Sequence, residues 1–484
     1  MNKHNSYTLN SDGKLSFAVK LLIALALFAG FILHILPEYD RSYNAALLDK
    51  VDRLTSIDEP KIVLIGNSNL PFGIDSKMLE EAEGMPVVNM GLHAACGNAF
   101  LEEMAKLNVV PGDIYIICHT EYDDDDTIPD EMAVWSSIEN HFKLWKLLRP
   151  KDAETMWRSF PVYLKKSLTL YASGPQKEPS ENLYSRSSFN EYGDIKIERP
   201  RCFYSFADGD VKAPTAGEAA VKRINELNDY LTSRGARLLI AGAPIANGPI
   251  TAEAQDFIDF QEELEAGVDC PVISCFLDYM FDFKYFYDTS LHLNDYGTKL
   301  RTQQLISDLS RWAENGYNSD STGSSYTDVA ADVSLPHITD LGDYLDALIR
   351  AKDRYTVIIS VKDDVSAELP YELSDKLHQL GVRADLKNGF RYSYIGIIVN
   401  GAAETEMFEH EMIVNEGSFD EDRMKYRIVS AGADRGNFSS IVLNEQEYSK
   451  NIRGLNFVVY SNETHRVLDE VAFETCIPEL TCDR

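Results

Sequence analysis

The sequence predicts a membrane-anchored α/β protein with one transmembrane helix, a domain built on a parallel sheet, and a smaller, β-rich α/β domain. Three observations favour this architecture. An apolar run of helical length lies near the N-terminus, short apolar strands then alternate with helical segments, and a second strand-rich stretch follows a small polar linker. At 484 residues, with 44% hydrophobic residues, the chain is long enough for two or three domains with cores of their own.

The run from Leu15 to Leu36 is apolar except for Ser16, Lys20 and His34, and it is long enough to cross a bilayer core of about 30 Å. No small-residue cleavage site follows it, so we expect an uncleaved signal-anchor rather than a removed signal peptide. Lysines precede the run and acidic residues follow it. The positive-inside tendency therefore predicts a cytoplasmic tail at 1–14 and extracytoplasmic main domains.

The chain carries 46 Lys and Arg but 77 Asp and Glu, a formal net charge of −31. Such an acidic surface repels phosphate backbones, so nucleic acid is not an expected partner. The four aspartates at 123–126 cannot all face one ion, and a solvated loop is expected there. The seven cysteines include no CxxC pair, and no metal or cofactor is indicated. Cys476 and Cys482 would bridge in an oxidising compartment or remain idle thiols, and both interpretations stay open.

The first domain is predicted at 58–314. Five apolar segments have the pattern of parallel strands: Lys61–Ile65, Pro86–Met90, Ile114–Cys118, Arg237–Ala241 and Pro271–Ser274. Helical segments at 76–83, 99–107 and 217–234 complete the alternation of a doubly wound sheet. Residues 123–215 form an aromatic-rich insertion, which would be a cap over the site, a partner-docking surface or a set of extra core helices.

Two stretches of this domain hold the candidate chemistry. Ile62 to Ile65 form an unbroken apolar run, and the turn Gly66-Asn67-Ser68 follows it, which places the Ser68 hydroxyl at the carboxyl edge of the sheet. The second stretch, 286–297, contains Asp288 and His292. A serine nucleophile needs a base within hydrogen-bond reach, an acid that orients the base, and donors for the oxyanion.

Together the two stretches resemble the SGNH (GDSL-like) hydrolase superfamily, in which the first block supplies a serine nucleophile and the last block an aspartate and a histidine. The resemblance implies a three-layer α/β/α domain with Ser68 as nucleophile, His292 as base and Asp288 as orienting acid. The family's aspartate lies three residues before the histidine, whereas Asp288 lies four before it and Ser290 two before it. The group that orients His292 is therefore left open.

The second block of the family resembles the segment 87–97. It implies oxyanion donors from the backbone N–H groups of Ser68 and of the turn from Gly91 to Ala94. Ala94 stands where the family has glycine, and Gly91 is the other candidate. A backbone N–H exists at both positions, so either can serve as a donor.

The third block, with its oxyanion asparagine, is not present in this sequence. Its place after the third strand puts Thr120 or Glu121 near the expected position. Glu121 and Asn69, the neighbour of the candidate nucleophile, are expected to contact the substrate.

The blocks also resemble a membrane-anchored subset of the superfamily, which includes relatives of the teichoic-acid D-alanyl transfer protein and of exopolysaccharide O-acetyltransferases. The shared elements are Gly-Asn-Ser-Asn at 66–69, Gly-Ile-Asp at 73–75, and Phe-Tyr-Asp at 286–288 before His-Leu-Asn at 292–294. Such proteins work outside the membrane, often beside a multispanning membrane acyltransferase. The resemblance implies that partner and a cell-surface glycan, in addition to the lipid bilayer around the apolar helix.

A linker is predicted at 315–334, where the composition is small and polar. The second domain, 335–480, opens with a strand at 354–364 and a helix at 370–380, capped by Gly381. Strands at 390–401, 453–460 and 467–475 follow.

The Arg-Gly-Leu-Asn element at 453–456 and the Phe-Glu-Thr element at 473–475 resemble the ILEI/PANDER-like domain. That resemblance implies a compact β-rich module that binds carbohydrate. Tyr392 and Tyr394 are candidates to stack on sugar rings, with burial in the core as the alternative for each.

These features predict an extracytoplasmic, membrane-anchored, serine-dependent hydrolase or O-acyltransferase that acts on an acyl ester, such as acetyl, of a cell-surface glycan. No sequence feature decides between hydrolysis and transfer. The alternative is a non-catalytic glycan-binding or assembly subunit of a surface-polysaccharide modification system. The missing asparagine and the second domain motivate this alternative.

Overall fold

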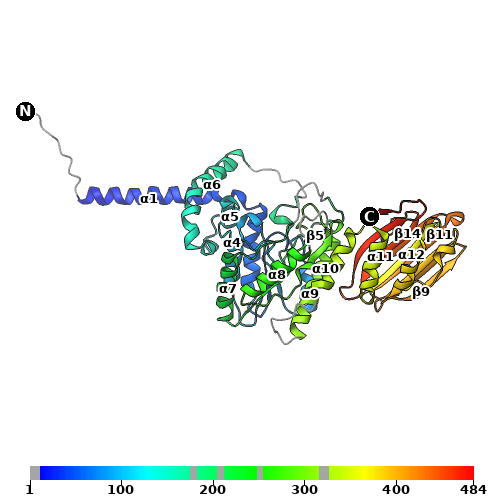
Figure 1. The fold of residues 1–484 in the computed structure, drawn as a ribbon. Helices are drawn as coiled ribbons and strands as arrows, with labels where there is room; N and C mark the ends of the chain where they lie inside the picture. The colour runs from blue at the N-terminus through cyan, green and yellow to red at the C-terminus, as the bar shows by residue number, and fades with distance from the viewer. Residues whose placement is uncertain (1–10, 175–181, 204–211, 248–253, 315–325) are drawn as a thin grey trace, which may run out of the picture.

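The computed structural model describes residues 11–174, 182–203, 212–247, 254–314 and 326–484. They form an N-terminal apolar helix, a domain with a parallel sheet and helices, and a curled mixed β domain, in agreement with the fold class expected from the sequence at this level of detail. Figure 1 shows the apolar helix projecting from one side of the first domain, with the β domain at the opposite end.

Helix α1 runs from Ser11 to Ile35, and its window Phe17–His34 has a mean hydropathy of 2.2 with none of it buried. Among the described residues it is the helix long and apolar enough to cross a membrane, as a signal anchor or a signal sequence. Leu36, directly after it, is buried in the core of the first domain. The helix therefore enters the domain without a spacer.

The first domain is built on a four-stranded parallel sheet in the order β2-β1-β3-β4. The strands are β1 (Ile62–Ile65), β2 (Val87–Asn89), β3 (Ile114–Ile117) and β4 (Arg237–Ile240). Every residue of β1 is buried, because a central strand covered on both faces has no solvent side. The predicted fifth strand at 271–274 is reduced to one parallel bridge between Ile240 and Val272, since the chain turns into a 3-10 helix at 276–279.

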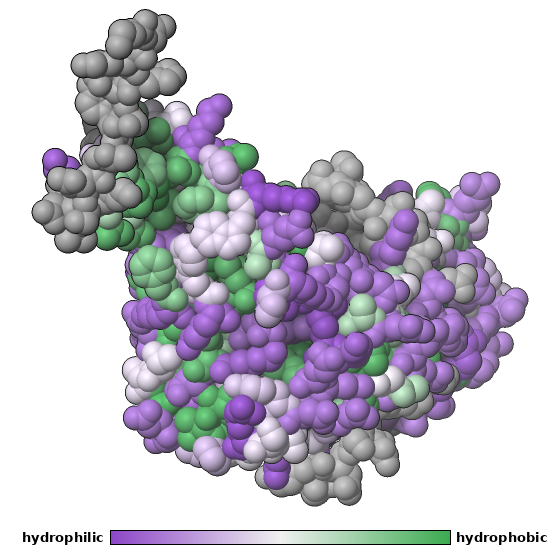
Figure 2. Space-filling view, turned by 90° about the vertical axis from the view of Figure 1, so that its left-hand side faces the viewer, coloured by the Kyte–Doolittle hydropathy of each residue, from purple (hydrophilic) through white to green (hydrophobic). Residues whose placement is uncertain are grey.

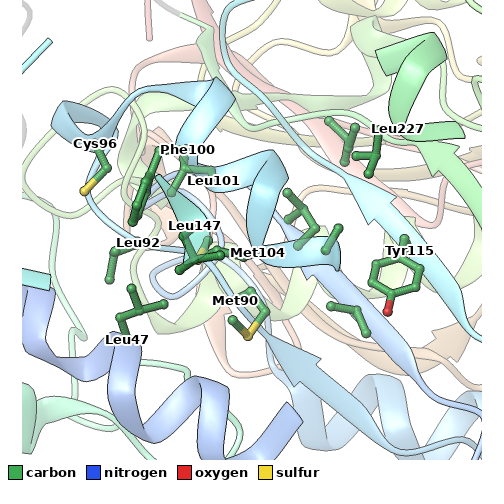
Figure 3. Packing of buried hydrophobic residues seen from close by; sticks show 14 of the residues in the cluster. Leu47, Met90, Leu92, Cys96, Phe100, Leu101, Met104, Tyr115, Leu147 and Leu227 are labelled. Atoms are coloured by element: carbon green, nitrogen blue, oxygen red, sulfur yellow. The ribbon is translucent and has the colours of Figure 1, made fainter. Parts of the chain in front are cut away.

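Helices cover both faces of this sheet. On one face, Val63 and Ile65 pack with α2 (Leu47–Ser56), α4 (Asn98–Glu103) and α7 (Glu218–Thr232), in the cluster drawn in Figure 3. On the other face, Ile62 and Leu64 pack with α3 (Ser76–Glu83) and α9 (Asp295–Glu314). The helices predicted at 76–83, 99–107 and 217–234 correspond to α3, α4 with the 3-10 turn after it, and α7.

The insertion at 123–215 combines two of the expected arrangements. Its first half forms α5 (Glu131–Ile138) and α6 (Ala153–Ser173), and Trp135 of α5 is buried in the main core. The segment 182–203 instead lies over the turn that follows β1, where the Ile195 N–H donates to the Pro71 carbonyl at 2.9 Å. The insertion is thus partly core and partly a cover.

The first domain is completed by α8 (Ala254–Gly267) and by a parallel pair of short strands, β5 (Ile245–Asn247) and β6 (Met280–Asp282). The last residues of the predicted linker form α10 (Tyr326–Ser334). Val329 and Val333 of α10 pack against Phe257 and Leu277 of the first domain. This part of the linker stretch is helical because it has an apolar surface to pack on.

The second domain is a ten-stranded mixed sheet that curls into a half-barrel. Its order is β13-β12-β11-β7-β14-β15-β16, with β8 paired to β7 and β9, and β10 paired to β11. The strands are β7 (Tyr355–Asp363), β8 (Ser393–Val399), β9 (Ala402–Glu409), β10 (Ile413–Phe419), β11 (Met424–Gly432), β12 (Phe438–Leu443), β13 (Gln446–Glu447), β14 (Gly454–Ser461), β15 (Arg466–Glu474) and β16 (Thr481–Asp483). Helices α11 (Leu341–Arg350) and α12 (Tyr371–Leu380) pack on the sheet. Cys476 and Cys482 are separate thiols.

Candidate active site

Ser68 lies in a tight turn directly after β1, at the carboxyl edge of the parallel sheet. The Asn67 carboxamide holds this turn: its Oδ1 accepts the Asn69 N–H at 3.0 Å, and its Nδ2 donates to Thr120 Oγ1 at 2.7 Å. A side chain at Gly66 would meet the Cys118 carbonyl at 2.8 Å, so the close approach of the turn to the end of β3 requires glycine. The turn is therefore rigidly joined to the neighbouring strand.

Ser68, His292 and Asp288 form a continuous hydrogen-bonded chain. Ser68 Oγ lies 2.9 Å from His292 Nε2, and His292 Nδ1 lies 2.9 Å from Asp288 Oδ1. The imidazole stacks on the Phe72 ring, with 3.9 Å between ring centroids and 9° between planes. Asp288, rather than Ser290, is thus the group that orients His292. This is the arrangement that nucleophilic serine chemistry requires.

Tyr184, which the sequence did not single out, is a fourth member of this group. Its hydroxyl donates to Asp288 Oδ2 and lies 3.3 Å from His292 Nδ1. It comes from the covering segment of the insertion, and no motif in the sequence marks it. Burial raises the pKa of Asp288, but hydrogen bonds from His292 and Tyr184 outweigh this effect and hold that pKa below its ordinary value.

Replacing Tyr184 with phenylalanine should remove one of the two donors that stabilise the Asp288 carboxylate. Because the pKa of Asp288 is depressed, activity that needs the carboxylate persists down to low pH, and the variant should lose it at a higher pH than the wild type. We also expect a rate about tenfold lower at neutral pH, the cost of one hydrogen bond to a charged group. The pH profile of ester hydrolysis measures both effects.

Tyr43→Phe is the matched control for this prediction. The Tyr43 ring lies 6.1 Å from the Tyr184 ring, and its buried hydroxyl has no hydrogen-bond partner among the described residues. Its removal should leave the profile unchanged. Identical profiles for the Tyr184 variant and the wild type would contradict a positioning role.

The expected oxyanion donors differ in their availability. The Gly91 N–H donates to Asn89 Oδ1 at 3.0 Å, so it is engaged within its own loop and the prediction of a donor role for it is wrong. Gly91 serves close packing instead, since a side chain there would meet Pro71 at 2.4 Å and Leu70 at 2.7 Å. For the Ser68 and Ala94 N–H groups, the role as oxyanion donors remains a prediction.

Ala94 opens a short 3-10 turn beside the site. Its neighbour His93 has a pKa lowered by burial and, to a smaller extent, by the proximity of His292. The Tyr43 ring lies 6.3 Å from that of His93 and 6.1 Å from that of Tyr184, so the loop that contains Ala94 borders the site. Thr120 occupies the place of the missing asparagine, and since its oxygen accepts from Asn67, its own hydroxyl proton is left to donate.

A cleft of about 650 Å³ adjoins this group of residues, a size that suits a small ligand or part of a larger one. One wall is the loop 288–291 that leads to His292, and another is the segment 119–121 after β3. Glu121 is exposed and lines the cleft, as its predicted substrate contact requires. The third wall, 243–246, follows β4, so the carboxyl ends of β3 and β4 both open into the cleft.

Asn69 does not reach this cleft, and the prediction that it contacts substrate is wrong. It is fully buried, its carboxamide donates to Asn67 Oδ1 and the Cys118 carbonyl, and its carbonyl and Oδ1 accept from Arg301 at 2.7 and 2.8 Å. Arg301, on α9, is itself fully buried. These contacts tie the nucleophile turn to α9, which begins just after His292.

The two tyrosines of the second domain have different environments. Tyr394 is fully buried and donates to Glu406 at 3.0 Å, so it belongs to the core and cannot stack on a sugar. Tyr392 is half-buried, with its ring 5.0 Å from Phe408 and 5.4 Å from His410. Beside it in the chain, the Phe390 side chain is 64% exposed. Sugar stacking by Tyr392 therefore remains a prediction.

The fold and the site define a parallel-sheet α/β domain with a Ser–His–Asp chain at the carboxyl edge of its sheet. No protein-family model matches the sequence, and neither the curated proteins nor the solved structures give a match.

Proposed function

We propose that this protein is an extracytoplasmic, membrane-anchored, serine-dependent acyl-ester hydrolase or O-acyltransferase of the SGNH type, acting on a cell-surface glycan. The observation that carries the proposal is the chain from Ser68 through His292 to Asp288, with 2.9 Å at both steps, beside a cleft at the carboxyl edge of a parallel sheet. Ser68 and His292 are 224 positions apart in the sequence, and the fold brings them together.

In the proposed reaction, His292 Nε2 takes the Ser68 hydroxyl proton as Oγ attacks the acyl carbonyl carbon. The oxyanion that forms accepts hydrogen bonds from the Ser68 and Ala94 N–H groups and from the Thr120 hydroxyl, and His292 returns the proton to the leaving alkoxide. The acyl group is then esterified to Ser68. Asp288 and Tyr184 keep the imidazole oriented throughout.

The second half-reaction decides between hydrolysis and transfer. His292 takes a proton from water or from a glycan hydroxyl, that oxygen attacks the acyl carbon, and Ser68 recovers its proton as the acyl group leaves. The exposed cleft accommodates either acceptor, so both activities belong to the proposal. A multispanning membrane acyltransferase is the proposed source of the acyl group for transfer.

The resemblance to the SGNH superfamily and to its membrane-anchored subset supports the proposed chemistry, and helices on both faces of the sheet are consistent with a three-layer domain. We further propose an ILEI/PANDER-like, carbohydrate-binding role for the second domain. The exposed Phe390 and half-buried Tyr392 form the aromatic surface that supports it.

A non-catalytic glycan-binding or assembly subunit is the second candidate. Thr120 in place of the family's asparagine favours it, since a weaker oxyanion site would lower turnover. In that case, replacement of Tyr392 should weaken glycan binding, whereas Ser68→Ala should leave it unchanged. Ser68 should then show no reactivity toward a serine-directed probe.

Labelling of the detergent-solubilised full chain with a fluorophosphonate probe tests the proposal. The full chain is needed because Leu36 and Tyr43, next to α1, are buried in the first domain. Wild type should label, whereas Ser68→Ala and His292→Ala should not. Ser290→Ala is the matched control, because this serine lines the same cleft and lies outside the hydrogen-bonded chain. Labelling of Ser68→Ala at the wild-type level would refute the proposal.

A further inference from the structure

The segment 141–173, which contains α6, differs in charge from the rest of the chain. It holds seven Lys and Arg residues and only two Asp and Glu residues, a net charge of +5 in a protein whose total is −31. Lys165 and Lys166 are exposed on α6, and neither forms an ion pair with another described residue. Lys143, Arg149, Lys151 and Arg158 pair with carboxylates. Lys165 and Lys166 are therefore the positive charges of α6 that are left available to an anionic surface.

Helix α6 also exposes an apolar stripe. Trp157, Pro161, Leu164, Leu168 and Tyr171 recur at intervals of three and four residues, so they share one face of the helix. Trp157 is 57% exposed, Leu168 44% and Tyr171 43%. The face that packs on the domain is a different one, formed by the buried Met156, Tyr163 and Ser167. The folded domain covers the stripe only in part: Leu164 packs on the core and one side of the Trp157 ring lies near Trp135 and Trp145, while Leu168, Tyr171 and the rest of Trp157 remain exposed.

The stripe is continuous with the end of the apolar helix α1. The Tyr171 ring lies 5.6 Å from that of His34, the last residue of the apolar window. Nearby, the Tyr163 hydroxyl donates to the Leu36 carbonyl at 3.1 Å, and the Tyr39 and Tyr163 rings stack at 5.7 Å. Figure 1 shows α6 beside the end of α1, and Figure 2, viewed from the side on which α1 projects, shows hydrophobic residues in the part of this face where the helix stands out.

We infer that α6 lies in the membrane–water interface of the outer leaflet, as a second membrane contact beside the spanning helix α1. Tryptophan and tyrosine concentrate at this depth because their rings are apolar and their N–H and O–H groups need water. Lysines on the flank of an interfacial helix meet lipid phosphates, and the apolar face enters the headgroup–acyl boundary. In this arrangement the lipid bilayer covers the exposed apolar stripe of α6.

The inference takes α1 as membrane-spanning but is independent of the catalytic proposal. Because α1 runs into the domain without a spacer, two contacts at one end fix the orientation of the first domain on the membrane. A spanning helix alone would leave the domain free to tilt relative to the membrane plane, whereas contacts by both α1 and α6 restrict this tilt.

Tryptophan quenching in reconstituted vesicles tests the inference with the full chain. The chain has four tryptophans, of which Trp135 and Trp312 are buried and Trp145 is half-buried, so Trp157 is the exposed reporter. In vesicles of phosphatidylcholine and phosphatidylglycerol with brominated acyl chains, we expect the fluorescence to be quenched relative to unbrominated vesicles. Most of this quenching should be lost in Trp157→Phe, and bromines near the headgroups should quench more than deep ones.

A second test reverses the charge of the two exposed lysines of α6. Lys165→Glu combined with Lys166→Glu should weaken the quenching in phosphatidylglycerol-containing vesicles, while Lys425→Glu, exposed on the second domain, should have no effect. Quenching of Trp157 by aqueous acrylamide but not by brominated lipid would overturn the inference, and so would protection from both quenchers, which would mean that protein covers the stripe. No outcome depends on catalytic activity, so failure here leaves the proposed function standing.

Discussion

Replacing His292 with alanine is expected to lower the rate of ester hydrolysis by about 10⁴-fold or more, the loss seen when a serine nucleophile is deprived of its base. The reason is geometric, since His292 Nε2 is the acceptor 2.9 Å from Ser68 Oγ, and its loss leaves the hydroxyl proton without an acceptor at that distance in the site. Hydrolysis of a chromogenic acetate ester by the full chain in detergent measures the effect.

The same experiment contains an internal check on the chain of residues. The effects of substitutions within one catalytic unit are not additive. The single variants Ser68→Ala and His292→Ala and the double variant that combines them should therefore all have the same residual rate. His410→Ala, exposed on the second domain, should keep the wild-type rate. Losses that multiply in the double variant would show that the two residues do not act together.

Arg301→Met is expected to lower the free energy of unfolding of the first domain by about 2–4 kcal/mol. The guanidinium donates to the Asn69 carbonyl and Oδ1 and, at 3.3 Å, to the Gly242 carbonyl, all in a fully buried setting. Methionine fills much of the volume but leaves these three acceptors without their donor. Chemical denaturation in detergent, followed by circular dichroism, measures the change.

Arg234→Met is the matched control for this stability prediction. Arg234 is exposed and its contacts are local, so its replacement should change the free energy of unfolding by less than about 0.5 kcal/mol. If the two variants proved equally stable, Arg301 would not be the tie between the nucleophile turn and α9.

The sequence predicted those elements that a local pattern encodes. The apolar run of β1, the helix α3 and the strand β7 all lie within a residue or two of their expected bounds. Strands β9 to β13 were not predicted, and for β9 and β10 the reason is that most of their side chains are partly or fully exposed. The burial of β9, for example, is partial along its whole length.

For the site, residue types and order were enough to find Ser68, His292 and Asp288, but not the groups that support them. Tyr184 and Arg301 act through contacts with residues more than 100 positions away, and no spacing rule encodes such pairs. Asn69 and Tyr394 were misassigned because sequence position next to a site, or in a strand, does not tell which way a side chain points. Only the packed structure decides this.

The origin of Tyr184 in the covering segment has a consequence for how the protein unfolds. Ser68, Tyr184 and His292 come from three distant parts of the chain. The covering segment is held to the sheet domain by side-chain hydrogen bonds, such as those that Asp194 accepts from Ser76 and Asn89, and by packing, rather than by a strand in the sheet. Segments of this kind open in partial unfolding events at a lower free energy than the core around β1. Hydrogen exchange at 184–195 should therefore be faster than at 62–65, and enzymatic function should disappear at a denaturant concentration at which the parallel sheet is still intact.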